Sequence, residues 1–118
     1  MLAPVLVVED EPGVRELIKV VLTKAGYQVV AVDGPRAALA ALTRQPDIAL
    51  MLVDVVMPEM NGYDLVAAAR AIVAGVQVVF ISAFTRDPAR QLKGDRFLAK
   101  PFTAEALTAI VEVALAAS

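Results

Sequence analysis

Acidic, hydroxyl and amine side chains follow four apolar segments of this sequence, each at the point where the segment ends. In chain order these groups are Glu9-Asp10-Glu11, Asp54, Ser82 and Lys100. At an effective dielectric constant of 20, two carboxylates about 5 Å apart repel by roughly 3 kcal/mol, so a cluster of them requires protonation or a cation. Mg²⁺ suits such a cluster, because it binds through one or two carboxylates and leaves coordination positions open for phosphate oxygens.

Each of these groups also has an ordinary structural explanation. Acidic residues at a helix start complement the helix dipole, Asp54 and Ser82 could begin turns, and Lys100 could be a solvated surface lysine. Taken together, however, they would place carboxylates, a hydroxyl and an ammonium along one edge of one sheet. This joint placement favours a functional site.

The elements that position these groups alternate along the chain. Residues 48–53 are entirely apolar, as in a strand buried on both faces. Val14, Leu17, Ile18, Val21, Leu22 and Ala25 recur at helical spacing until Gly26. The predicted strands are 5–8, 29–32, 48–53, 76–81 and 96–99. The predicted helices run from near Pro12 to Ala25, over 37–44 and 63–73, and after a Thr103 cap. This alternation predicts an α/β fold with a parallel sheet and right-handed crossovers, whose ligand site lies at the carboxyl ends of the strands.

Length and composition agree with one small domain. The chain has 118 residues, of which 58% are apolar and 20% charged, and a formal charge of −2. Its basic residues are scattered, so we expect no direct contact with nucleic acid. It has no cysteine, and its apolar stretches are too short to span a membrane. No signal peptide is recognised at the start, and we expect a cytoplasmic domain without membrane contact.

The motifs at these strand ends resemble those of the receiver domain of two-component response regulators. They are Val-Val-Glu-Asp-Glu-Pro at 7–12, Leu-Val-Asp-Val-Val-Met-Pro-Glu-Met-Asn-Gly at 52–62, Phe-Ile-Ser-Ala at 80–83 and Lys-Pro-Phe at 100–102. The resemblance covers the whole chain, 1–118, as a single receiver domain. It implies a doubly wound, flavodoxin-like (βα)5 fold with strand order 2-1-3-4-5.

The resemblance also implies a role for each strand-end group. Asp54 would accept a phosphoryl group from a phosphohistidine, and Lys100 would pair with Asp54 and then with a phosphoryl oxygen. Ser82 would move inward to hydrogen-bond another oxygen, and Pro101 would carry a peptide bond that is usually cis in this family. Mg²⁺ or Mn²⁺ would be held by Glu9, Asp10, Asp54 and the backbone carbonyl of Val56. The domain would catalyse only its own phosphorylation and dephosphorylation, with a histidine kinase or histidine phosphotransfer protein as its bacterial partner.

The chain departs from the common receiver pattern in three places. Glu9 replaces the commoner aspartate, and Phe97 stands where many receivers have tyrosine, so switching at this position would act by packing. Between Ser82 and Lys100 the expected fourth helix is weak and broken over 87–92, where Pro88 and Gly94 leave less than two good turns. This shortened fourth helix resembles the receivers associated with hybrid sensor histidine kinases.

Two further expectations concern phosphoryl lifetime and docking. The resemblance places Val56 and Phe84 beside the path of the hydrolytic water, where neither side chain can orient water by hydrogen bonding. We therefore expect a long-lived phosphorylated state, unless both side chains point into solvent. Val20 lies off the predicted buried face of its helix, between Glu16 and Lys24, and marks a candidate docking face for the partner.

Other classes fit less well. Phosphatases of the haloacid dehalogenase type need a second acid two residues after the nucleophilic aspartate, where this chain has Val56. The glycine-rich motifs of nucleotide-binding folds are missing from the sequence. A phosphorylation-independent interaction module of receiver fold is the remaining alternative, and the intact set of polar strand-end residues argues against it.

Overall fold

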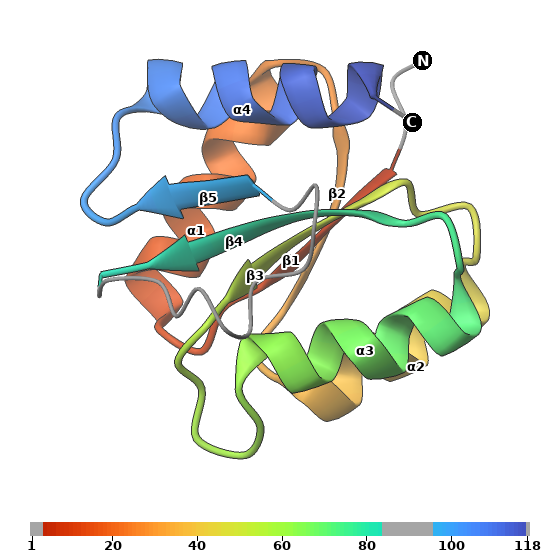
Figure 1. Cartoon of the computed structure of the whole chain (residues 1–118). Helices are drawn as coiled ribbons and strands as arrows, with labels where there is room; N and C mark the ends of the chain where they lie inside the picture. Colours follow the sequence, from red (N-terminus) through yellow and green to blue (C-terminus); the bar gives the residue numbers. More distant parts are fainter. Residues whose placement is uncertain (1–3, 84–95, 118) are drawn as a thin grey trace.

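The computed structural model describes residues 4–83 and 96–117, which form a parallel sheet covered by helices on both faces (Figure 1). The strands are β1 (Pro4–Val8), β2 (Gln28–Val32), β3 (Leu50–Asp54), β4 (Gln77–Ser82) and β5 (Arg96–Ala99). The helices are α1 (Pro12–Lys24), α2 (Pro35–Arg44), α3 (Gly62–Ile72) and α4 (Ala104–Ala116). The helix expected over 87–92 lies outside the described residues, so its shortening stays a prediction, and α4 is the helix expected after Thr103.

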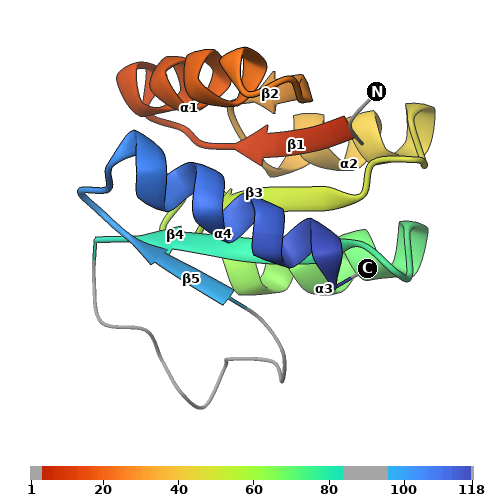
Figure 2. The same cartoon turned by 90° about the horizontal axis from the view of Figure 1, so that it is seen from above.

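The sheet has the strand order β2-β1-β3-β4-β5, and every neighbouring pair is parallel. This confirms the doubly wound, flavodoxin-like order that the resemblance to receiver domains implied. Helices α1 and α4 lie on one face of the sheet, and α2 and α3 lie on the other (Figures 1 and 2). Because all the strands run the same way, the ends of β1, β3, β4 and β5 meet at one edge.

The core consists of two apolar layers separated by the sheet. Alternate residues of β1 and β3 point into opposite layers: Leu6 and Met51 pack toward α2 and α3, whereas Val7 and Leu52 pack toward α1 and α4. All five residues of β1 and of β3 are buried, which explains why these strands carry no polar alternation. No helix within the described ranges has both the length and the apolar character needed to cross a bilayer.

Helix boundaries follow local capping. The side chain of Glu11 accepts hydrogen bonds from the backbone N–H groups of Gly13 and Val14 and so begins α1. Gly26, at φ 101°, ends this segment in the left-handed region that glycine favours. Thr103 caps α4 through the backbone N–H of Ala106, as predicted.

Two expectations about residue placement need correction. Ile48 was predicted to begin the third strand, but its N–H bonds to Gln45 in a turn, so β3 begins at Leu50 and extends to Asp54. Leu17 was predicted to share the buried face of α1, yet it is 50% exposed, because Ile18 and Leu22 are the residues that α1 buries completely. Helix α1 therefore presents an apolar side chain to solvent where the periodicity suggested a core position.

A close backbone contact joins the start of α3 to the end of β3. The N–H of Gly62 donates to the carbonyl of Val55 at 2.8 Å. A Cβ atom at Gly62 would lie 2.7 Å from the backbone oxygen of Asp54 and 3.0 Å from both Val53 and the Val55 backbone. A side chain at position 62 would therefore push against the backbone that carries Asp54, and backbone yields less readily than a flexible side chain.

We predict that Gly62→Ala lowers the free energy of unfolding by roughly 1–3 kcal/mol, the usual range for overpacking a closely packed site. Urea unfolding followed by circular dichroism measures this change. Gly75→Ala is the matched control, because a Cβ at Gly75 meets no atom within 4 Å. Equal stability of the two variants would show that the contact at Gly62 is not limiting.

Candidate functional site

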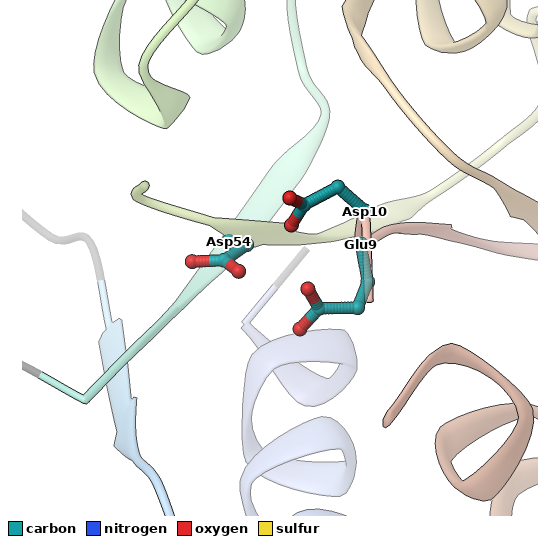
Figure 3. Close-up of side chains that lie close together, drawn as sticks. All are labelled: Glu9, Asp10 and Asp54. Carbon is teal, nitrogen blue, oxygen red and sulfur yellow. The ribbon is translucent and has the colours of Figure 1, made fainter. Parts of the chain in front are cut away.

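The carboxylates expected from the sequence come together at the edge of the sheet where the strands end. Figure 3 shows Glu9 and Asp10 projecting from the end of β1 toward the side on which Asp54 lies. Ligand atoms of the three carboxylates all lie within 4.8 Å of one another. Glu9 is fully buried and Asp54 is 5% exposed, whereas Asp10 lies closer to solvent. The structure thus brings together acidic groups from positions 9, 10 and 54, as predicted.

Lys100 lies between two of these carboxylates. Its Nζ atom is 2.8 Å from Oε1 of Glu9 and 3.1 Å from Oδ2 of Asp54. The sequence predicted a pairing with Asp54 but not the shorter contact with Glu9. This contact joins the residue that follows β1 to the residue that follows β5. Three carboxylates against one ammonium leave a net negative site with the oxygen donors that a divalent cation prefers.

Both oxygen atoms of Asp54 have partners. Oδ1 accepts a hydrogen bond from the backbone N–H of Val56 at 3.0 Å, and Oδ2 faces Lys100. The backbone N–H of Glu11 donates to Oε2 of Glu9 at 3.2 Å. These bonds fix the orientation of the two buried carboxylates before any ligand arrives.

Burial and neighbouring charge shift the ionisation of this cluster. Burial, together with a hydrogen bond to Asp54 and the negative charge of Asp54, raises the pKa of Glu9 from 4.5 to about 7, even though hydrogen bonds from Lys100 and the backbone of Glu11 act in the opposite direction. Burial lowers the pKa of Lys100, but its hydrogen bonds to Glu9 and Asp54 outweigh this and leave it raised. Lys100 therefore remains an ammonium at neutral pH, and Glu9 exchanges its proton near neutrality.

Ser82 is the last residue of β4 and is 7% exposed. Its strand neighbour in β5 is Ala99, and its carbonyl oxygen accepts a hydrogen bond from the N–H of Lys100 at 3.0 Å. Because Asp54 pairs with Ile81 in the β3–β4 ladder, Ser82 lies one residue beyond the partner of Asp54. The peptide bond between Lys100 and Pro101 is cis, as the resemblance implied.

Phe97 belongs to an aromatic cluster with Phe80 and Tyr63. The ring centroid of Phe97 is 5.3 Å from that of Phe80 and 6.4 Å from that of Tyr63. Tyr63 directly follows Gly62, which contacts the backbone of Asp54. The predicted switch position is therefore packed against the start of α3, a link that the sequence did not reveal because Tyr63 reads as an ordinary core residue.

Val56 and Phe84 are the two side chains expected to flank the path of the hydrolytic water, and the structure describes only Val56. Val56 is 53% exposed and lies two residues beyond Asp54. Phe84 lies outside the described residues, so their joint shielding of the phosphoryl group stays a prediction. The backbone carbonyl of Val56 likewise stays a predicted metal ligand.

Sequence reasoning missed two residues that support the site. Gly62 allows α3 to approach Asp54, and the signal for it was a glycine directly after the asparagine cap of a helix. Arg15 donates from Nη1 to the backbone oxygen of Glu9 at 2.9 Å. The only available signal for Arg15 was an arginine in the first turn after an acidic loop, which is also typical of a solvated helix face.

We expect the contribution of Glu9 to the free energy of unfolding, measured in a metal-free buffer with chelator, to fall as the pH rises from about 4.5 to about 7. The folded protein binds a proton at Glu9 more tightly than the unfolded chain does in this window, so raising the pH favours unfolding. Urea titrations across this range, compared with Glu9→Gln, measure the contribution. The variant should lose this part of the pH dependence, and an unchanged profile would contradict the raised pKa.

Comparison with known proteins identifies the class. The family model of the response regulator receiver domain matches residues 5–112. The chain is 36% identical over 116 residues to the response regulator protein FleR of Pseudomonas aeruginosa, covering 94% of this chain and 24% of FleR. It is 33% identical over 118 residues to the response regulator receiver protein CpdR of Brucella abortus, covering 97% of this chain and 98% of CpdR. The chain therefore spans about a quarter of FleR and nearly all of CpdR.

Solved structures show the same fold. The receiver domain of the hybrid histidine kinase CckA matches with a TM-score of 0.85 and 31% identity over 95% of this chain and 98% of that chain. The response regulator TrrA of Thermotoga maritima, in complex with Mg²⁺-BeF, matches with a TM-score of 0.87 and 25% identity over 97% of this chain and all of that chain. The chain belongs to the receiver domain family of two-component response regulators, whose members are phosphoacceptor signalling domains.

Proposed function

We propose that Asp54 is the residue that accepts the phosphoryl group, and that residues 1–118 form a single receiver domain. The observation that carries this proposal is the position of Asp54: a nearly buried carboxylate at the end of β3, 3.1 Å from Lys100 and beside two further acids. A carboxylate oxygen of Asp54 attacks phosphorus as the nitrogen–phosphorus bond of a phosphohistidine breaks. The electron pair of that bond stays on the imidazole nitrogen.

The surrounding groups stabilise the charge on the phosphoryl oxygens during transfer. Lys100 moves from its carboxylate partners toward one oxygen, and the Ser82 hydroxyl donates to another. The N–H of Val56 holds the second oxygen of Asp54, so that the first stays directed at phosphorus. The protein contributes positioning and electrostatics, and its only reactions are its own phosphorylation and dephosphorylation.

The donor set fits Mg²⁺, or Mn²⁺. Glu9, Asp10, Asp54 and the carbonyl of Val56 would hold the ion. When bound, it supplies positive charge to the carboxylates and to the phosphoryl oxygens. The fit is supported by the excess of carboxylates over ammonium in the cluster and by the burial of Glu9 and Asp54.

We propose that phosphorylation is read at Phe97 through packing. The phosphoryl group adds about −1.5 to −2 charge beside Ser82, which draws that hydroxyl inward. Phe97 has no hydroxyl, so its response is a change in contact with Phe80 and Tyr63. The surface over β5 changes as a result, and its reader is another domain or protein.

The partner that donates the phosphoryl group is a histidine kinase or histidine phosphotransfer protein. A groove of about 300 Å³ lies beside Lys100, and its described lining is largely apolar: Val14, Leu17, Ala83, Lys100, Pro101 and Phe102. Leu17 and Val20 are 50% and 45% exposed and lie one turn apart on α1. Because Lys100 forms part of the groove, a surface that delivers a phosphohistidine to Asp54 covers it.

The relatives named above are bacterial, which supports a bacterial cytoplasmic setting.

We predict that acetyl phosphate with Mg²⁺ adds one phosphoryl group to the wild type and none to Asp54→Asn, because only Asp54 combines the carboxylate with Lys100 and the metal ligands. Intact mass spectrometry measures the addition. Asp64→Asn is the matched control, since it removes an acid at the start of α3 and should leave labelling intact. If the folded wild type takes no phosphoryl group, a phosphorylation-independent interaction module is favoured instead.

Leu17→Glu should slow phosphoryl transfer from an autophosphorylated histidine kinase at least ten-fold, because it places a charge in the apolar docking groove. Labelling by acetyl phosphate, which needs no protein surface, should be unchanged. Val113→Glu is the control: Val113 is 56% exposed on α4, outside the groove. Loss of both reactions in Leu17→Glu would indicate a folding defect, and normal transfer from the kinase would contradict the docking face.

A further inference from the structure

Arg15 lies in the first half of α1 and is partly buried beside the acidic loop that follows β1. Its Nη1 atom donates a hydrogen bond to the backbone carbonyl oxygen of Glu9 at 2.9 Å. This carbonyl belongs to the peptide group that joins Glu9 to Asp10. Arg15 therefore contacts the backbone between two of the acidic residues and not a carboxylate that the proposed chemistry uses.

The same short loop is held from two other directions. The N–H of Glu9 donates to the carbonyl of Val32 in β2 at 3.1 Å, and the N–H of Glu11 donates to the side chain of Glu9. A peptide group is planar, so fixing its oxygen also fixes the orientation of the N–H side. The bond from Arg15 thus restrains the peptide plane from which Asp10 continues, and Figure 3 shows the Asp10 side chain leaving the backbone toward Asp54.

We propose that Arg15 is a positioning residue for the divalent cation: it holds the Glu9–Asp10 peptide so that both carboxylates face Asp54 before the ion binds. The inference rests on the proposed function, because it assumes that these three acids bind the ion. Groups that orient ligands from outside the coordination shell affect metal affinity by about 10–100-fold in proteins. Arg15 differs from such groups in acting through the backbone and not through a ligand side chain.

The two roles that Arg15 could have, as a nearby charge or as a positioning residue, predict changes of opposite sign in Mg²⁺ affinity when Arg15 is replaced. A guanidinium near the site repels a divalent cation, so if its charge were its only influence, replacing it with a neutral residue would tighten Mg²⁺ binding. If Arg15 positions the loop, the same replacement weakens binding, because Asp10 then samples directions away from Asp54. The sign of the change in affinity therefore separates the two roles.

The test is the Mg²⁺ dissociation constant of Arg15→Met in the full chain, measured by NMR titration because the protein has no tryptophan. We expect binding about ten-fold weaker than in the wild type. Lys19→Met is the matched control, since it removes one positive charge from an exposed position one turn further along α1 and should stay within two-fold of the wild type. Arg15→Lys, which keeps the charge and a donor, should recover part of the lost affinity.

A second readout needs no metal. In the metal-free protein, the amide resonances of Asp10 and Glu11 should broaden or shift in Arg15→Met and remain unchanged in Lys19→Met. Mg²⁺ binding that is unchanged or tighter in a folded Arg15→Met would overturn the inference. If Arg15→Met does not fold, Arg15→Gln provides the same comparison with a smaller change. A wild type that binds no Mg²⁺, with Asp10→Asn behaving identically, would instead remove the metal site of the proposed function.

Discussion

The ammonium group of Lys100, held between Glu9 and Asp54, is the interaction on which the arrangement of the site depends. Lys100 directly follows β5, so these two ion pairs connect the end of β5 to the ends of β1 and β3. Without it, two largely buried carboxylates would face each other at a cost of several kcal/mol at low effective dielectric. The lysine offsets this repulsion but leaves the cluster net negative, so the resting site keeps a demand for positive charge that the lysine alone does not meet.

The backbone around the site is as constrained as its charges. Gly62 lets α3 approach the end of β3, and Tyr63 next to it packs against the rings of Phe80 and Phe97. The start of α3 is thus in contact with both Asp54 and the predicted switch residue. The proposed reading of phosphorylation at Phe97 depends on this packing, because position 97 lacks the hydroxyl found in many receivers.

The patterns of the sequence predicted the α/β fold with a parallel sheet, and the resemblance to receiver domains supplied the strand order. They also predicted that Glu9, Asp10, Asp54 and Lys100 lie together, while the roles of these residues stay predictions. Two patterns can be recognised without a structure: apolar runs of strand length, and polar residues at the ends of these runs. The sequence did not predict the exposure of Leu17. Helical periodicity shows which residues share a face of a helix, but it does not show how much of that face the sheet covers. Sequence reasoning also missed Arg15 and the contact between Glu9 and Lys100, since each depends on the three-dimensional path of a loop. The helix expected over 87–92 and the residue Phe84 lie outside the described residues, so the shortening of that helix and the role of Phe84 stay predictions.

The wide separation of the site residues along the chain has a consequence for folding. Glu9 lies near the beginning and Lys100 near the end, and β1 occupies an inner position in the sheet between β2 and β3. During synthesis, β1, β2 and β3 can pair as they emerge, but the ion pair with Lys100 closes only after β5 has joined the sheet. Such non-local pairing is slow compared with helix formation. The complete cluster of Glu9, Asp54 and Lys100 can therefore form only once β5 has taken its place at the edge of the sheet.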